Sequence, residues 1–178
     1  MQTSALQVIH ERRSIRRYKD TPIPSADLEQ ILDAGIWAPS ALNKQPWHFT
    51  VITDRALIDS IHAQGAAWLK QTEGRVVEKH CLHHAPCVLL VSGRADNHWA
   101  PIDCALASQN VLLAARALGY GSCFVGMLSQ WLQSPAAADF LTQCHIPDGY
   151  QPQHFIALGT PDEVAPAPAR IEQTITYL

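Results

Sequence analysis

The chain has 178 residues, of which 47% are hydrophobic and 16% are charged. This length suits a single domain with a sizeable core. The formal charge of -3 arises from 13 basic and 16 acidic residues, and so mild a charge argues against nucleic acid or an anionic membrane as a partner. The charged share lies below the roughly 25% of an average globular protein. This deficit predicts that part of the surface is hidden in a homodimer.

Two features of the sequence bear on the compartment. The first residues have neither the basic start nor the apolar core of a secretory signal, and the longest uncharged run, 117–138, is too polar and too broken to predict a membrane span. The cysteines are odd in number and mostly lie in apolar runs, as expected of reduced thiols; they are Cys81, Cys87, Cys104, Cys123 and Cys144. The sequence therefore predicts a cytoplasmic protein.

Hydrophobic spacing and turn residues divide the chain into short helices and strands. Ser4 and Gln7 form a capping box, Ser25 caps a second helix that Pro39 ends, and Ser134 precedes another. Helices are predicted at 4–13, 25–38, 54–62, 68–79, 103–118 and 134–143, and strands at 47–53, 86–91, 122–125 and 154–158. A proline-rich arm then precedes an alternating stretch, Ile171, Gln173, Ile175 and Tyr177, that predicts a strand paired with a distant element. The pattern as a whole predicts a three-layer α+β domain.

A cluster of arginines follows the first predicted helix. Arg12, Arg13, Arg16 and Arg17 surround Ser14. Guanidiniums present forked donors that match phosphate oxygens, and a hydroxyl adds a further donor, so the cluster suits a compact phosphate monoester. On composition alone, a solvated basic turn at a helix C-terminus explains the cluster better.

Two loops carry groups that suit a planar heterocycle. The segment between Pro39 and Pro46 offers the hydroxyl of Ser40 and the amides of Asn43 and Gln45 as hydrogen-bonding groups. The glycine-bounded segment 121–126 allows a flat ligand to approach backbone N–H groups closely. Each pattern is also typical of an ordinary connection between elements.

The run His80-Cys81-x-His83-His84-x-x-Cys87 is dense in ligands for a transition metal. Cys87 opens a predicted buried strand, and no second cluster lies at zinc-finger spacing. Helix-end capping and partly buried hydrogen bonds therefore explain the histidines better, and no metal is predicted. A metal-binding regulatory protein built on this cluster stays open as an alternative.

Four ordered motifs together resemble the FMN-dependent nitroreductase family, as a short, single-domain member. They are Arg12-Arg13-Ser14-Ile15-Arg16, the loop Ala38-Pro39-Ser40-x-x-Asn43-x-Gln45-Pro46-Trp47, the helical Ala105-x-x-Ser-Gln109-Asn110-x-Leu112-Leu113-x-Ala115, and Leu118-Gly119-Tyr-Gly-Ser122. The resemblance spans nearly the whole chain. It implies a mixed, mostly antiparallel sheet flanked by helices, an FMN-binding domain at 1–160, and an arm at 161–178 whose last strand is exchanged with the dimer partner.

The resemblance also implies the cofactor and the residues that hold it at the dimer interface. Arg12, Ser14 and Arg170 would bind the FMN phosphate, Arg13 would add contacts, and Arg16 would reach the pyrimidine edge of the flavin. The loop that crosses from the other subunit would be Pro39, Ser40, Ala41 and Asn43, while Gly126 and Met127 would present a backbone N–H to flavin N5. The polar flavin-edge residue usual before the second strand has no clear match in 78–84.

The function implied by the resemblance is ping-pong hydride transfer from NADH or NADPH, through FMN, to a nitroaromatic, a quinone or a similar small electron-poor acceptor. No side chain is predicted to act as acid, base or nucleophile, because the flavin supplies the redox chemistry. An alternative from a different class is a non-catalytic FMN store or sensor.

Overall fold

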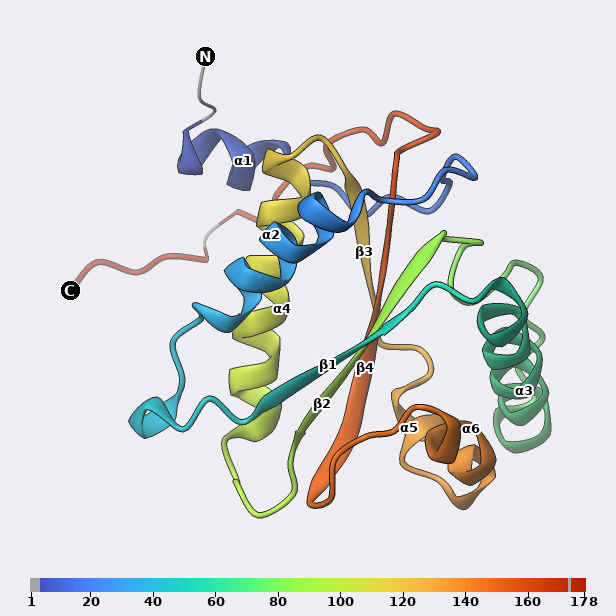
Figure 1. Cartoon of the computed structure of the whole chain (residues 1–178). Helices are drawn as coiled ribbons and strands as arrows, with labels where there is room; N and C mark the ends of the chain where they lie inside the picture. Colours follow the sequence, from blue (N-terminus) through green and yellow to red (C-terminus); the bar gives the residue numbers. More distant parts are fainter. Residues whose placement is uncertain (1–3, 173) are drawn as a thin grey trace.

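The computed structural model describes residues 4–172 and 174–178, and a four-stranded sheet lies at its centre (Figure 1). The strands are β1 (Trp47–Ile52), β2 (Cys87–Arg94), β3 (Gly121–Val125) and β4 (Tyr150–Gly159), in the order β1-β2-β4-β3. All three neighbouring pairs are antiparallel, and an isolated bridge between Ser14 and Ser122 adds a parallel pairing at the outer side of β3. The sheet is thus mostly antiparallel, as predicted.

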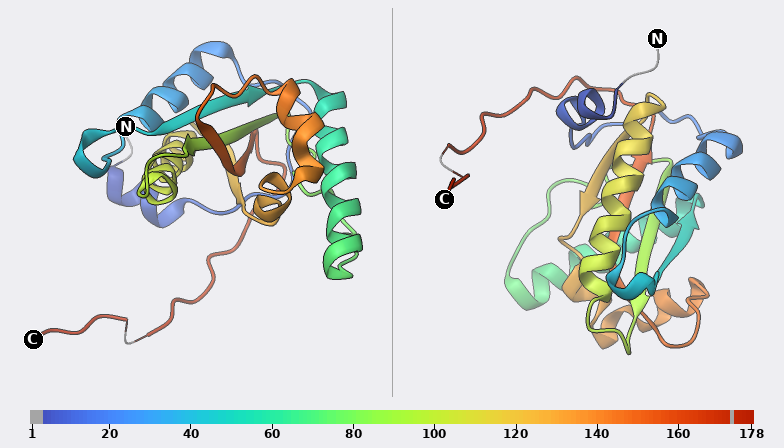
Figure 2. Two further views of the ribbon diagram at one scale, coloured as in Figure 1. Left: turned by 90° about the horizontal axis from the view of Figure 1, so that it is seen from below. Right: turned by 90° about the vertical axis from the view of Figure 1, so that its left-hand side faces the viewer.

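Helices cover both faces of the sheet. They are α1 (Ala5–Glu11), α2 (Ser25–Ile36), α3 (Arg55–Glu73), α4 (Ala100–Ala117), α5 (Ser129–Leu132) and α6 (Ala138–Gln143), with 3-10 turns η1 (Ala41–Asn43) and η2 (Pro135–Ala137). Figures 1 and 2 show α2 and α4 on one face and α3, α5 and α6 on the other, while α1 packs near the end of α4. None of the helices in the described part of the chain is both long and apolar enough to cross a membrane.

The central strand β2 explains why the domain has two cores. Leu89 and Val91 pack with α2 and α4, whereas Val88 and Leu90 pack with α3, α5 and α6. Successive side chains of a strand point to opposite faces, so a strand covered on both faces has no polar positions. This is why 86–91 forms an unbroken apolar run in the sequence.

Close helix packing positions α4 against α2. A Cβ on Gly35 would lie 2.8 Å from Cγ2 of Val111, so the small residue permits the two helices to approach. The amide of Asn110 donates a 2.9 Å hydrogen bond to the carbonyl oxygen of Ala34. This part of the predicted helical motif therefore has a structural role.

Several predicted boundaries were wrong. The two helical pieces at 54–62 and 68–79 form one helix, α3, which ends where Gly74 adopts a φ of 64°. The helix predicted at 103–118 begins earlier, at Ala100, with a proline in its first turn, as is common. The strand predicted at 154–158 extends over 150–159, because β4 pairs along both β2 and β3. The helix predicted at 134–143 is divided into η2 and α6.

The last part of the chain leaves the body of the domain. Pro161 forms a bridge with Tyr18, and the backbone oxygen of Asp162 accepts a hydrogen bond from Nε of Arg17 at 2.6 Å. Beyond this point the described residues form neither helix nor strand and run outward past α1 (Figure 2). Gln173 lies outside the described residues, and pairing of this stretch with a second chain stays a prediction.

Candidate active site

A cleft of about 390 Å³ gathers the residues predicted to bind a phosphate. It is lined by Arg12, Arg13, Ser14, Arg16 and Arg170, together with small residues of the arm. Arg170 is distant from the others in sequence, and only the path of the arm brings it to them. No acidic residue lines the cleft, so its guanidiniums would attract an anion.

The start of strand β3 holds this segment in place. The N–H of Ile15 donates to the carbonyl oxygen of Ser122 at 3.0 Å, and the side chain of Ile15 is buried against Gly121. A Cβ on Gly121 would lie 2.9 Å from Cβ of Ile15, so only glycine admits this contact. The apolar anchor at Ile15 leaves Ser14 and Arg16 on either side of it at the cleft.

Arg13 also has a structural role at the end of α1. This is the role that the alternative explanation, a basic turn at a helix C-terminus, gave to the whole cluster. Its Nη1 donates to the carbonyl oxygens of His10 and Arg12, each at 2.7 Å. A cation at this position satisfies carbonyl groups at the end of α1 and interacts favourably with the helix dipole. Arg12, Arg16 and Arg170 form no ion pair with a carboxylate within the part of the chain described here.

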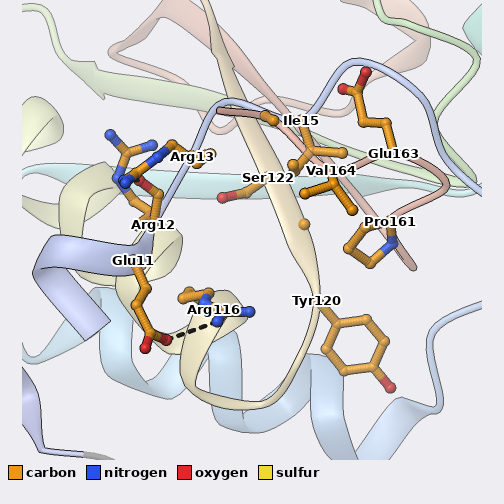
Figure 3. Close-up of a pocket in the computed structure, with 12 residues that line it drawn as sticks. Glu11, Arg12, Arg13, Ile15, Arg116, Tyr120, Ser122, Pro161, Glu163 and Val164 are labelled. Atoms are coloured by element: carbon orange, nitrogen blue, oxygen red, sulfur yellow. Dashed lines mark hydrogen bonds and ion pairs between the residues drawn. The ribbon is translucent and has the colours of Figure 1, made fainter. Parts of the chain in front are cut away.

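A second hollow of about 290 Å³ adjoins the arginine cleft and shares Arg12, Arg13 and Ala165 with it (Figure 3). Arg116 at the end of α4 also lines it, but Nη2 of Arg116 is 2.7 Å from Oε2 of Glu11. The hydrogen bonds from Gln7 and Arg116 lower the pKa of Glu11. Because this ion pair already neutralises Arg116, we expect an anion to bind at the arginines of the cleft and not at Arg116.

The loop predicted to contact FMN is strained and anchored. Leu42, Asn43 and Gln45 have φ values of 53°, 52° and 46°, a region that side-chain-bearing residues rarely adopt. The N–H of Ala41 donates to Oδ1 of the buried Asp103 at 3.1 Å, and the N–H of Gln45 donates to Oγ of Ser40 at 2.9 Å. The first turn of α4 thereby fixes the shape of the loop.

The other predicted flavin contact lies at the far end of β3. Gly126 directly follows the strand and is exposed, and Met127 is half-buried. Four residue steps along a strand span about 13 Å, which separates Gly126 from Ser122 beside the arginine cleft. Gly126 and the arginine cleft therefore lie along one strand of the same chain.

Phe124 is a site candidate that the sequence analysis missed. It lies on β3 between the arginine cleft and Gly126, and the residue is 44% exposed. The ring stacks on His154 of β4 with centroids 4.2 Å apart. The exposure of an aromatic residue on an otherwise buried strand is the signal, and it is visible only in the tertiary structure.

The loop and the arginine cleft cannot serve one ligand within a single chain. The loop is bound to the first turn of α4 through Asp103, whereas the arginine cleft adjoins the hollow that Arg116 lines in the last turn. The 18 residues of α4 span about 27 Å at 1.5 Å per residue. Figure 1 shows the loop and α1 at opposite ends of this helix. The two sets of predicted residues are thus not brought together within one chain.

The histidine cluster gathers around an aspartate that the sequence motif did not contain. Ligand atoms of Asp59, His80 and His84 all lie within 4.8 Å of one another, while Cys81 and Cys87 do not join this group. Nδ1 of His80 accepts the backbone N–H of Leu82 at 3.1 Å, and Nε2 is 3.2 Å from Oδ1 of Asp59.

The hydrogen bonding of His80 fits a structural role. Burial lowers the pKa of His80 to about 4, so its ring is neutral near pH 7. Since Nδ1 is an acceptor, the proton of the neutral ring is on Nε2. A metal would need a lone pair there, so the hydrogen bond at Nδ1 favours the predicted capping role, while Nε2 is buried and has no hydrogen-bond partner among the described residues. The absence of a metal site stays a prediction.

The model of the nitroreductase family matches residues 9–160 of this chain. The chain belongs to the nitroreductase family. A candidate NADH dehydrogenase/NAD(P)H nitroreductase of Archaeoglobus fulgidus is 34% identical over 163 residues, which cover 89% of this chain and 86% of that protein. A nitroreductase of Bacteroides fragilis solved with bound FMN has a TM-score of 0.89 at 30% identity, and 98% of each chain is covered. An iodotyrosine deiodinase of Thermotoga neapolitana is 25% identical over 181 residues, covering 94% of each chain.

These similarities establish the coarse activity of this nitroreductase. It is an FMN-dependent oxidoreductase, and the relative from Archaeoglobus fulgidus is named for the use of NADH or NADPH. The arginine cleft fits the cofactor, because guanidiniums that form no ion pair and a hydroxyl are suitable partners for a phosphate monoester. The prediction of the family, the fold and the cofactor from the four ordered motifs is confirmed.

Proposed function

We propose that this nitroreductase works as a homodimer with FMN at each subunit interface. The observation that carries the proposal is the separation of the arginine cleft from the loop by the length of α4. Two copies related by a twofold axis would bring the loop of one subunit to the arginine cleft of the other. When bound, FMN would supply ping-pong hydride transfer from NADH or NADPH to a nitroaromatic, a quinone or a similar small acceptor.

The residues of the chain would bind and orient the cofactor. Arg12, Ser14 and Arg170 would hold the phosphate, and Arg13 would add contacts while it caps α1. Arg16 would place a cation near the pyrimidine edge, where it favours the negative charge of a reduced flavin.

The remaining contacts of the proposed site would come from both subunits. Gly126 and Met127 would meet the reactive edge of the flavin, and Phe124 would offer its exposed ring to a planar ligand. The partner would contribute Pro39, Ser40, Ala41 and Asn43 from its loop. No side chain is assigned an acid, base or nucleophile role.

Exposed apolar residues support a dimer. Ile102 and Leu106 are one helical turn apart on α4, and both are exposed, as are Trp37 and Leu42 near its start. Soluble monomers rarely leave a large apolar patch uncovered. The arm, 161–178, would lie on the partner and add a strand to its sheet, since its apolar residues Ile171, Ile175 and Tyr177 are exposed within one chain.

A reducing compartment fits the thiols. All five cysteines are free and buried, as is usual in the cytoplasm, which we propose as the location. We also propose that the electron acceptor is one of the small electron-poor compounds named above, such as a nitroaromatic or a quinone. The relatives differ in the activity for which they are named, nitroreductase in one case and iodotyrosine deiodinase in another, so the acceptor has to be measured directly.

An anaerobic spectroscopic titration tests the activity. Flavin bands of the purified protein should bleach with NADH or NADPH and return on addition of menadione or nitrobenzene. Bands that never bleach would refute turnover and favour the alternative of an FMN store or sensor. A colourless protein that takes up no FMN and carries stoichiometric zinc would instead favour the metal-binding alternative.

A mixed dimer tests the shared site. An Arg12→Ala/Arg170→Ala chain and a chain with a disrupted loop, Asn43→Ala/Ala41→Pro, should each bind FMN at least about tenfold more weakly, since each loses charge-assisted or positioning contacts. The heterodimer purified from co-expressed chains should regain about one FMN per dimer, because one of its two sites is intact. A mixed dimer with no recovered FMN would contradict the shared site.

Arg17→Ala is the matched control for the arginine variants. Arg17 belongs to the same cluster, but its guanidinium pairs with Asp162 at 3.4 Å and does not line the cleft. Its FMN affinity should therefore stay near that of the wild type. An equal loss in Arg17→Ala and in Arg12→Ala would mean that general charge, and not the cleft, binds FMN.

A further inference from the structure

A separate cleft of about 410 Å³ lies between the Pro39–Pro46 loop and the turn that joins β2 to α4. Lys44 lines it from the loop, Arg94, Asp96 and Trp99 from the turn, and Tyr150 from the start of β4. We call it the η1 cleft. Of the residues that line it, only Ala41 is among those predicted to contact FMN.

Backbone hydrogen bonds hold the walls of the η1 cleft. The N–H of Arg94 donates to the carbonyl oxygen of Pro46 at 2.9 Å, which ties the turn to the loop. The N–H of Ala95 donates to the oxygen of Gly149 at 2.8 Å, and the N–H of Trp99 donates to Oδ1 of Asn97 at 2.9 Å. Binding sites for small molecules are usually preformed in this way.

The charges in the η1 cleft leave one cation in excess. Nη2 and Nε of Arg94 lie 2.5 and 3.0 Å from the two carboxylate oxygens of Asp96, a bidentate pair. The Arg94 guanidinium is also 5.8 Å from the centre of the Tyr150 ring. Among the lining residues Asp96 is the single carboxylate, so Arg94 neutralises it and Lys44 remains available for an anion.

The apolar part of the η1 cleft is aromatic. Trp99 is 51% exposed, although an indole usually packs when a partner is available. Its only ring neighbour among the described residues is His98, at 5.4 Å between centroids. An aromatic ligand in the cleft would cover this exposed surface.

We infer that the η1 cleft binds the electron acceptor and selects aromatic compounds that carry an anionic group, with Lys44 pairing with the anion and Trp99 packing on the ring. The inference rests on the proposed function, because the wall formed by the loop also carries Ala41 and Asn43, which would contact the FMN of the partner. In the proposed dimer, an acceptor in this cleft would lie beside the cofactor.

Matched acceptors test the charge preference in the FMN-loaded dimer. We expect kcat/KM to be higher for 4-nitrobenzoate than for 4-nitrobenzamide, and Lys44→Gln to lower the ratio of the two values about fivefold. Lys70→Gln on the distant helix α3 is the charge-matched control and should leave the ratio unchanged. Trp99→Ala should weaken both acceptors, because it removes the shared aromatic contact.

Calorimetry gives a readout that does not depend on turnover. Benzoate, which is not reduced, should bind the wild-type dimer more tightly than benzamide, and Lys44→Gln should raise the Kd of benzoate about fivefold. Added salt should weaken benzoate binding, since the attraction is electrostatic. Equal affinity for benzoate and benzamide in the wild type, or an equal loss for both in Lys44→Gln, would overturn the inference.

The two proposals fail in different ways. If menadione still reoxidises the reduced enzyme while benzoate and 4-nitrobenzoate show no preference, only the η1 cleft assignment is wrong. If NADH and NADPH leave the flavin bands unchanged while benzoate binds in a Lys44-dependent manner, the cleft binds aromatic anions but the proposed turnover is refuted.

Discussion

The buried histidine His154 should make the stability of the domain depend on pH. Its ring lies beneath α4, 5% exposed, with Nε2 2.7 Å from Oγ of Ser108. That hydroxyl is 2.7 Å from the carbonyl oxygen of Cys104 and donates its proton there, so it accepts the N–H of the imidazole. The neutral ring is satisfied, whereas a protonated ring would be a charge without solvent.

Burial lowers the pKa of His154 from 6.5 to about 4. Because the unfolded chain binds the proton more readily, the contribution to stability is complete above pH 6.5 and is lost as the pH falls toward 4. The full loss is about 3 kcal/mol at 1.36 kcal/mol per pKa unit, and the loss at pH 5 is about 2 kcal/mol.

Urea unfolding at pH 7.5 and pH 5, at constant FMN, measures this effect. In His154→Gln the drop in unfolding free energy between the two pH values should be about 2 kcal/mol smaller than in the wild type. Ser108→Ala is the control: it removes the hydrogen-bond partner but keeps the buried imidazole, so the pH dependence should persist. An identical drop in the wild type and in His154→Gln would refute the argument.

Three further perturbations test the packing. Gly65→Ala should destabilise the domain by about 1–3 kcal/mol, despite the better helix propensity of alanine, because the new Cβ would lie 2.6 Å from Cδ2 of Leu128; a urea midpoint that does not fall would contradict this. Trp131→Ala removes a fully buried ring and should cost about 3–5 kcal/mol, seen as a lower melting temperature. The five thiols are buried and should resist Ellman's reagent at pH 8 until denaturant is added; a thiol that reacts at once in the native protein would show an open site.

Local signals in the sequence located most elements and the pieces of the site. Oγ of Ser4 accepts the N–H of Gln7 at 3.2 Å at the start of α1, as the capping box predicted. The arginine cluster follows that helix, and the glycine-bounded segment 121–126 contains β3. These features depend on neighbouring residues, so their spacing carries the information. The four family motifs also predicted the identity of the cofactor, FMN.

Contacts between distant segments were not accessible from spacing. The carboxylate of Asp103 that fixes the loop at Ala41 is 62 positions away, and the Ser108 partner of His154 is 46 positions away. The end of the helix predicted at 68–79 was also wrong, because α3 ends at Gly74. This glycine ends the helix through a left-handed backbone conformation, and the hydrophobic pattern does not change there.

The sequence by itself determined the class of fold, the family and the cofactor, because each rests on short runs of residues whose order is preserved along the chain. Only the tertiary structure decided that the arginine cleft and the loop lie at opposite ends of α4 and that Phe124 is exposed. The physical reason is that these facts depend on the rigid length of a helix and on which surfaces the sheet leaves uncovered.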